Sequence, residues 1–215
     1  MTDSCANWGT AEFRYLPGFI ARGEADRLLE RLWRELHWER REIVLFGRRV
    51  LQPRLVAWYG DAGATYRYSG VTLQPRPWAA ELEALRRRIE RETACPFNAV
   101  LANAYRDGAD SMGWHSDDEP ELGPRPAIAS LSLGAERVFL LRPRQPDATG
   151  KRRSKRLILG HGSLLLMRGD SQARYQHCLP KTRRPVGRRI NLTFRWVVPQ
   201  DTRAAAPEGA SPIKR

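Results

Sequence analysis

The second half of the chain is a succession of short strand-like runs, and this pattern limits the possible folds more than any other feature. Each run has the length and composition of a β-strand, and turn-forming residues separate one run from the next. The runs cover residues 99–105, 127–133, 137–142, 156–159, 163–168, 172–178 and 189–197. Many short strands within one half of a chain predict a sandwich or barrel, with any helices packed outside it.

Two amphipathic helices are predicted in the first half of the chain. Residues 24–36 place Leu and Trp side chains on one stripe, and residues 78–92 do the same with Trp, Leu and Ile. Pro77 suits the first position of the second helix. Residues 43–76 carry Gly, Pro and aromatic residues with short β-like pieces. The expected fold class is therefore mainly β with flanking helices.

The length of 215 residues suits one domain with short appendages. We place this domain at residues 11–199. Residues 1–10 are polar and expected to be flexible, and residues 200–215 are small, polar and expected to be disordered. Residues 143–155 are polar and basic and predict an exposed hairpin loop.

The chain is strongly basic, with 37 Lys and Arg against 24 Asp and Glu, a net charge of +13. Such an excess favours a polyanionic partner, most simply nucleic acid. The alternative is codon bias, because nearly all the cations are Arg and the chain is rich in Ala, Gly and Pro. Clustering of the cations within 151–156 and 181–189 argues for the nucleic-acid partner.

The three cysteines, Cys5, Cys95 and Cys178, are widely spaced and form no CxxC pair. They suggest neither a disulfide framework nor a zinc knuckle, and they fit a reducing compartment. We also find no signal pattern and no apolar run of membrane length. The expectation is a monomer without a membrane partner, cytoplasmic and close to the nucleoid in a bacterium, or nuclear in a eukaryote.

A candidate metal site is formed by His115 and Asp117, two residues apart, together with the distant His177. On an extended strand the i, i+2 spacing would point the first two side chains the same way. Two imidazoles and one carboxylate suit iron(II) and leave positions open for substrate and oxygen, although zinc hydrolases use the same set. The other two histidines, His37 and His161, are expected to be structural.

The segment 189–195 alternates polar and apolar residues along its whole length. On a strand, Arg189, Asn191, Thr193 and Arg195 share one face, and the apolar residues share the other. Zinc hydrolysis has no need for such a cationic strand, whereas a 2-oxo dicarboxylate would need an Arg for its far carboxylate. A solvated strand edge is the alternative, and the strand alone does not decide between them.

These motifs together resemble the AlkB family of iron(II)/2-oxoglutarate dioxygenases, which repair alkylated nucleic-acid bases. The resemblance covers about residues 40–198, and its motifs are 103–108, 114–119, 128–134, 161–165, His177 and 189–195. It implies a double-stranded β-helix (jelly roll) at about 99–198, N-terminal helices, and a nucleotide-recognition lid within about 40–98. It also implies that iron(II), 2-oxoglutarate and O2 take part in the reaction.

The resemblance assigns roles to individual residues. His115, Asp117 and His177 would bind iron, and six further residues would bind 2-oxoglutarate: Asn103, Tyr105, Arg189, Asn191, Thr193 and Arg195. Which arginine takes which carboxylate stays open. On the substrate side, Asp118 would lie near the exocyclic nitrogen of the damaged base. For Glu119, a substrate role and a solvated acidic turn are equally good interpretations.

The lid resemblance concerns Tyr66, Tyr68 and Ser69, of which Tyr66 would flank a base flipped out of its stack. Phe46 lies between an apolar residue and two arginines and is a candidate DNA wedge. The alternatives are outward residues of an ordinary hairpin for the tyrosines and a core position for Phe46. Trp114 resembles members that favour single strands, so strand preference stays open.

The function expected from the resemblance is oxidative demethylation of N-alkylated bases such as 1-methyladenine and 3-methylcytosine in DNA, with release of formaldehyde. One alternative is the same chemistry on RNA or protein. Another, which rests on the net charge alone, is a basic nucleic-acid-binding jelly roll without catalysis.

Overall fold

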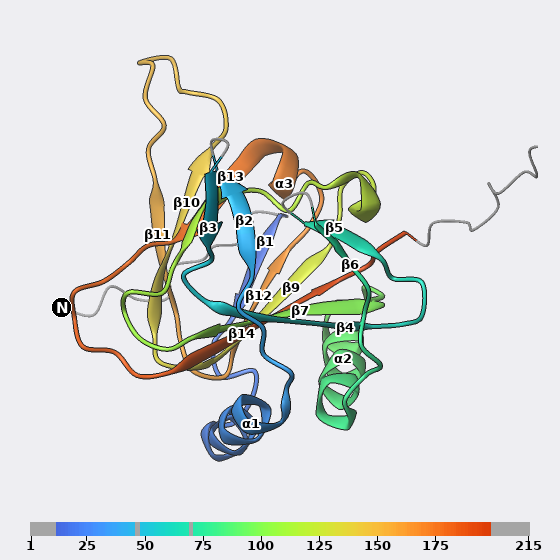
Figure 1. The fold of residues 1–215 in the computed structure, drawn as a ribbon. Coiled ribbons are helices and arrows are strands. Elements are labelled where there is room, and N and C mark those ends of the chain that lie inside the picture. The colour runs from blue at the N-terminus through green and yellow to red at the C-terminus, as the bar shows by residue number, and fades with distance from the viewer. Residues whose placement is uncertain (1–11, 46–47, 69–70, 199–215) are drawn as a thin grey trace, which may run out of the picture.

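The computed structural model describes residues 12–45, 48–68 and 71–198, and for residues 43–45, 48, 66–68 and 71–73 it describes the backbone alone. Two antiparallel sheets form the core (Figure 1). The six-stranded sheet has the order β1 (Phe13–Leu16), β12 (Ser163–Met167), β9 (Ile128–Gly134), β14 (Arg189–Arg195), β7 (Ala99–Tyr105) and β4 (Leu55–Gly60). The four-stranded sheet has the order β11 (Lys155–Leu159), β10 (Arg137–Pro143), β13 (Tyr175–Leu179) and β8 (Met112–His115). The predicted mainly-β jelly roll is confirmed.

Strand β14 lies inside the six-stranded sheet, between β9 and β7. Asn191 is in register with Asn103 on one neighbour and with Ser132 on the other. The apolar residues Ile190, Leu192 and Phe194 are fully buried in the core on the outer face of the sheet. The polar residues of the same strand therefore face the opposite sheet, as the alternation predicts.

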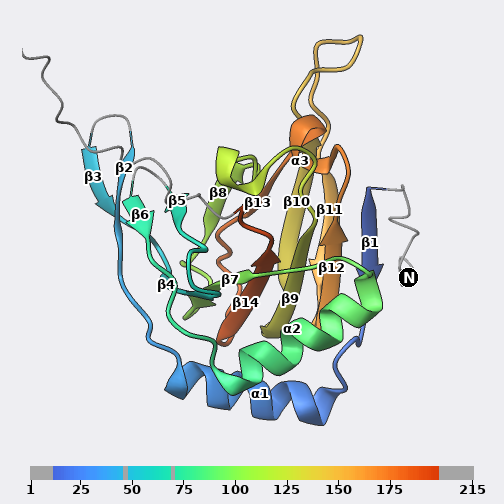
Figure 2. The same cartoon turned by 90° about the vertical axis from the view of Figure 1, so that its right-hand side faces the viewer.

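Helices α1 (Arg22–Glu35) and α2 (Ala80–Thr93) cover the outer face of the six-stranded sheet (Figure 2). Leu32 of α1 and the Leu82, Leu85 and Ile89 stripe of α2 pack into that core, which confirms both helices. No helix in the described part of the chain is long and apolar enough to cross a membrane.

The start of α2 corrects one prediction. Pro77 is not the first helical residue, because the helix begins at Ala80 and Ala79 is still extended. Trp78 explains the delay: its indole donates a hydrogen bond to Asp61 and its ring stacks on Phe194 at a centroid distance of 6.5 Å. These contacts hold the segment before Ala80 against the core.

The predicted strand at 172–178 is wrong in its first half. Residues Ser171–Arg174 form a short helix, α3, and β13 begins only at Tyr175. In α3 the amide of Arg174 donates to the carbonyl of Asp170, while the Gln172 side chain is buried against Asp117. Residues 171–174 therefore form one helical turn, held by the hydrogen bond within the turn and by the contact of Gln172 with Asp117. Strand β1 and the short 3-10 helix η1 (Pro120–Leu122) were not predicted.

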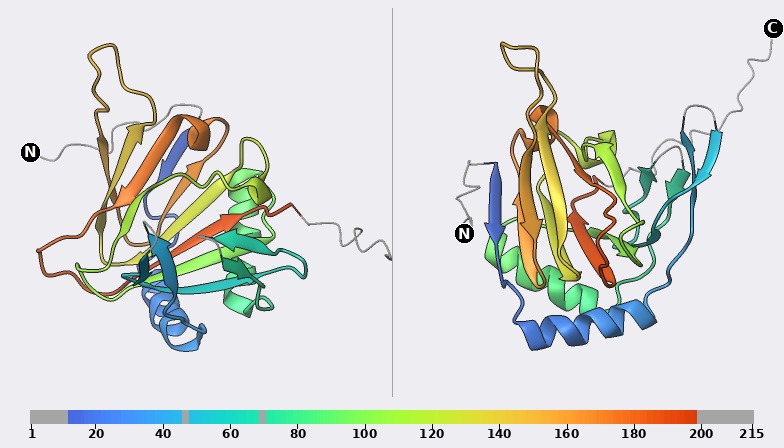
Figure 3. Two further views of the ribbon diagram at one scale, coloured as in Figure 1. Left: turned by 45° about the horizontal axis from the view of Figure 1, so that its top comes forward. Right: turned by 90° about the vertical axis from the view of Figure 1, so that its left-hand side faces the viewer.

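Three hairpins extend from the side of the molecule opposite α1 and α2 (Figures 1, 2 and 3). Two come from the 43–76 region: β2 (Glu42–Leu45) with β3 (Arg48–Leu51), and β5 (Tyr66–Tyr68) with β6 (Val71–Leu73). The third joins β10 to β11 and carries the basic loop, so the prediction of an exposed hairpin loop is confirmed.

Candidate active site

Strand pairing brings the two distant histidines together. β8 and β13 are antiparallel neighbours, and His115 lies opposite His177 in the register. Residues directly opposite each other on paired strands have neighbouring side chains. The two imidazole rings accordingly lie 4.2 Å apart between centroids.

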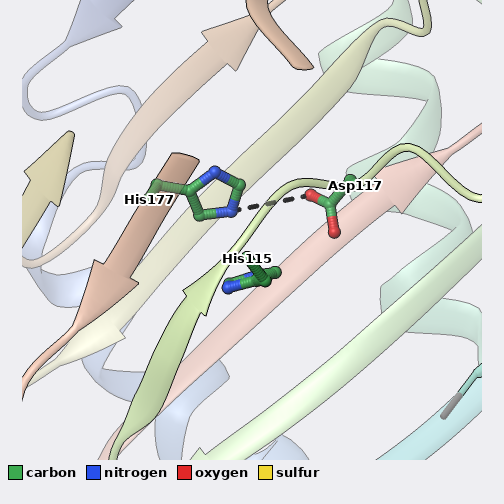
Figure 4. Close-up of side chains that lie close together, drawn as sticks. All are labelled: His115, Asp117 and His177. Atoms are coloured by element: carbon green, nitrogen blue, oxygen red, sulfur yellow. Dashed lines mark ion pairs between the residues drawn. The ribbon is translucent and has the colours of Figure 1, made fainter. Parts of the chain in front are cut away.

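Asp117 reaches the same point from outside the strand. β8 ends at His115, so the expected i, i+2 spacing along one strand does not apply. Instead, the amide of Asp117 donates to Oε1 of Gln172 at 2.9 Å, and its Oδ1 accepts from Nη2 of Arg195 at 2.7 Å. Figure 4 shows the carboxylate facing both imidazoles, with Oδ2 at 3.8 Å from Nε2 of His177.

The three side chains form a compact group. Within the described residues, His115, Asp117 and His177 each offer one ligand atom, and these atoms lie within 4.8 Å of one another. His115 uses Nδ1 for a 2.9 Å hydrogen bond to the carbonyl of Gly113. Because a carbonyl can only accept, Nδ1 carries the proton and Nε2 keeps its lone pair for a metal.

The electrostatics of the group suit a divalent cation. Burial opposes ionisation of Asp117, but Arg195 and the two histidines outweigh burial and hold the pKa of Asp117 well below its usual value. Burial lowers the pKa of His177 to about 3, helped by His115, and burial also lowers the pKa of His115. At neutral pH the site therefore presents one carboxylate and two neutral imidazoles, a donor set that fits iron(II) or zinc.

A partly open cavity lies between the two sheets, and the three metal ligands are part of its lining. All six residues expected to bind 2-oxoglutarate line it together with the three metal ligands, namely Asn103, Tyr105, Arg189, Asn191, Thr193 and Arg195. The solvated-edge alternative for β14 is therefore wrong.

Arg189 is the most informative of these residues because it is only 1% exposed. Nη2 donates to Oγ of Ser132 at 2.9 Å, while Nε and Nη1 find no hydrogen-bond partner within the described residues. Burial lowers the pKa of Arg189 to about 10, although Tyr105 opposes this, so the guanidinium stays charged at neutral pH. A buried cation with two unsatisfied nitrogens fits an anionic ligand in the cavity.

Several residues that hold this set in place were not predicted from the sequence. Ser130 and Ser132 on β9 bind Asn191 and Arg189, and the two-residue alternation of 128–134 was a signal for them. Arg54 is also buried, and its Nε donates to Oδ1 of Asn103 at 2.8 Å. No periodic pattern marks Arg54, because its role comes from the pairing of β4 with β7.

The expected structural histidines lie away from the metal group. His161 accepts a hydrogen bond from the amide of Gly134 on Nδ1 and lies 3.2 Å from Asp26 through Nε2. His37 is largely exposed, and its nearest ion-pair contact, with Glu39, is at 4.0 Å.

The structure describes the proposed substrate residues less completely than the metal ligands. Asp118 is paired with Arg144, and Glu119 occupies the N-cap position of η1; neither is among the residues that line the cavity. Tyr66 and Tyr68 lie on β5, of which the backbone alone is described. Ser69 and Phe46 lie outside the described residues.

Comparisons with known proteins agree with this site. The pattern of the 2OG-Fe(II) oxygenase superfamily matches residues 12–195. The chain is 46% identical over 203 residues to "Alpha-ketoglutarate-dependent dioxygenase alkB homolog 3" of Rattus norvegicus, covering 92% of this chain and 68% of that protein. It is 42% identical over 188 residues to "DNA oxidative demethylase ALKBH2" of Mus musculus, covering 84% of this chain and 78% of that protein.

The chain belongs to the AlkB family of 2OG-Fe(II) oxygenases. Two solved structures share the fold of this AlkB-family protein. The structure of OsALKBH1 has a TM-score of 0.59 and 17% sequence identity, and the match covers 86% of this chain and 97% of that one. An oxidoreductase of the 2OG-Fe(II) oxygenase family from Burkholderia pseudomallei has a TM-score of 0.58 and 14% identity, and the match covers 89% of this chain and 88% of that one. The chain is thus a dioxygenase that uses iron(II), 2-oxoglutarate and O2.

Gln172 supports the metal site of this AlkB-family enzyme without entering it. Its side chain is buried and accepts from the amide of Asp117. Gln172→Met keeps the volume but removes the acceptor, so we expect about tenfold weaker metal binding, as is common when a partner of a ligand is lost. Titration with Mn(II) measures this change in metal affinity.

The matched control is Ser171→Ala. Oγ of Ser171 accepts a hydrogen bond from Nε2 of Gln172 at 3.3 Å, whereas Asp117 is bound by Oε1 of Gln172. Ser171→Ala therefore leaves the acceptor for Asp117 in place and should leave the metal affinity unchanged. Equal affinities in Gln172→Met and the unmodified protein, both folded, would contradict a role for Gln172 at the metal.

Proposed function

We propose that this protein removes methyl groups oxidatively from N-alkylated bases of the 1-methyladenine and 3-methylcytosine type in DNA. The observation that carries the proposal is one cavity that holds both the His115, Asp117 and His177 group and the buried Arg189. Similarity to "DNA oxidative demethylase ALKBH2" over 84% of the chain supports the substrate class.

The two arginines of β14 suggest how 2-oxoglutarate lies in the cavity. Arg195 is bound to the metal carboxylate Asp117, so we assign to it the carboxylate that is held next to the metal. Arg189 has two unsatisfied nitrogens and lies beside Tyr105, so we assign to it the far carboxylate. Asn103, Asn191 and Thr193 would complete the walls of the pocket.

When bound, iron(II) with 2-oxoglutarate and O2 supplies the oxidising power, and the products are succinate, carbon dioxide, formaldehyde and the unmethylated base. The chain's own residues bind and orient. Arg195 keeps Asp117 ionised, and the Gly113 carbonyl fixes the tautomer of His115.

The substrate side of the proposal concerns the charged base. The methylated rings of 1-methyladenine and 3-methylcytosine are cationic, so Asp118 next to the metal carboxylate would attract them. Tyr66 on the β5–β6 hairpin would contact the flipped base, with Tyr68 and Ser69 nearby and Glu119 as a further candidate. The wedge role of Phe46 in duplex DNA stays a prediction.

One panel tests the proposal. Single-stranded DNA, duplex DNA, RNA and a peptide, each with a defined methyl group, are incubated with the iron-loaded protein, 2-oxoglutarate and O2, and formaldehyde is measured. We expect turnover of methylated DNA. Turnover of RNA or peptide alone would show that DNA is not the substrate. Metal-independent binding of the nucleic acids without any turnover would favour a non-catalytic role.

A further inference from the structure

Arg144 contacts the carboxylate that follows the metal ligand. It is the first residue after β10, at the base of the basic hairpin. Its Nη1 donates to Oδ2 of Asp118 at 2.5 Å. We propose that Arg144 is a positioning residue for base recognition, holding one oxygen of Asp118 so that the other is presented to the substrate. This rests on the proposed function, in which Asp118 meets the exocyclic nitrogen of the methylated base.

Arg144 is itself held in place by α3. Its amide donates to the carbonyl of Arg174 at 2.8 Å, which fixes its backbone. Its Nη1 also reaches the carbonyl of Gln172 at 3.3 Å. Exposed arginines usually move freely, whereas contacts from both backbone and side chain restrict this one. An anchored guanidinium can orient a partner carboxylate.

The same helix holds both neighbouring carboxylates of the site. The Gln172 side chain accepts from the amide of Asp117, and the Gln172 carbonyl accepts from Arg144, which binds Asp118. Asp117 belongs to the metal group, and Asp118 is the candidate for the base. One short helix therefore sets the position of the base-binding carboxylate relative to the metal.

The Arg144–Asp118 ion pair is too exposed to contribute much to the stability of the fold. The side chains of Arg144 and Asp118 are 40% and 48% exposed, and pairs in such surroundings contribute little to stability. Arg144 also opposes a cationic base by charge, but solvent and salt screen this repulsion. A hydrogen bond to the exocyclic nitrogen is directional, so loss of orientation is expected to outweigh loss of repulsion.

The test measures base preference by binding. Protein loaded with Mn(II) and 2-oxoglutarate is titrated with three single-stranded oligonucleotides that differ in one base: 1-methyladenine, 3-methylthymine and adenine. 3-Methylthymine is neutral and has no exocyclic amino group. We expect Arg144→Ala to lower the preference for 1-methyladenine over 3-methylthymine about three- to tenfold, and Arg144→Lys to restore part of it.

Two further variants give the controls. Arg153→Ala removes the same charge from the same hairpin, where Arg153 is 76% exposed and 3.5 Å from Asp147, and should leave the preference unchanged. Asp118→Asn should lower the preference, and adding Arg144→Ala to it should cause little further loss, because the two residues act as one unit. Mn(II) affinity should be unchanged in all of them.

The outcomes separate this inference from the proposed function. If Asp118→Asn lowers the preference but Arg144→Ala weakens all three oligonucleotides equally, Arg144 contacts phosphate and the positioning role is refuted. If Asp118→Asn leaves the preference unchanged, Asp118 does not read the base, and its proposed role fails together with that of Arg144. Demethylation in the unmodified protein would stand in either case.

Discussion

Asp117→Ala is expected to abolish metal binding and demethylation together. The change removes the one anionic ligand of the group and leaves two neutral imidazoles beside the buried Arg195 guanidinium. A cation placed there would then be repelled rather than neutralised. The loss of metal affinity should exceed the roughly 10- to 100-fold that follows loss of a ligand's partner. Mn(II) titration and formaldehyde release measure the two effects.

The control for Asp117→Ala is Asp110→Ala. Asp110 is also buried and is bound by an arginine, with Oδ1 at 2.8 Å from Nη2 of Arg106, but it does not line the cavity. It should lower thermal stability and leave metal affinity intact. A folded Asp117→Ala protein that binds Mn(II) like the unmodified protein would show that the metal lies elsewhere.

Arg189→Met is expected to raise the KM for 2-oxoglutarate by about 30-fold or more, since losing one partner of a buried charged pair costs roughly 2–5 kcal/mol. Methionine fills the space but offers no donor to a carboxylate. Metal affinity should change little, because Arg189 contacts Ser132 and Tyr105 rather than the ligands. The KM is measured from succinate formation at saturating methylated DNA.

Arg137→Met is the matched control for Arg189→Met. Arg137 is another buried arginine near Tyr105, but its guanidinium donates to the carbonyls of Asp107, Asp110 and Pro180. Its replacement should lower stability without raising the KM for 2-oxoglutarate. An unchanged KM in Arg189→Met would refute the assignment of the far carboxylate to this residue.

Local periodicity predicted the parts of the fold that depend on it. The alternation at 189–195 shows which side chains of β14 point into the apolar core and which point towards the cavity. The residues of both faces were therefore predicted correctly. The stripe of Leu82, Leu85 and Ile89 likewise predicted α2. These patterns are set by burial within one element, and a single sequence contains them.

Features that depend on contacts between distant segments were not predicted from the sequence. The delayed start of α2 depends on Trp78 meeting Asp61 and Phe194, and the turn at 171–174 depends on Gln172 reaching Asp117. The Arg144–Asp118 pair joins residues 26 positions apart. In each case the deciding contact comes from a residue far away in the sequence, which local propensity does not reveal.

The most direct test of the central claim is the stoichiometry of one reaction. A single-stranded DNA oligonucleotide with one 1-methyladenine is incubated with the iron-loaded protein, 2-oxoglutarate and O2, and the repaired base, formaldehyde and succinate are quantified. The proposed function predicts one formaldehyde and at least one succinate for each methyl group lost, and none of the three with His115→Ala. Succinate formed without any loss of the methyl group would contradict it.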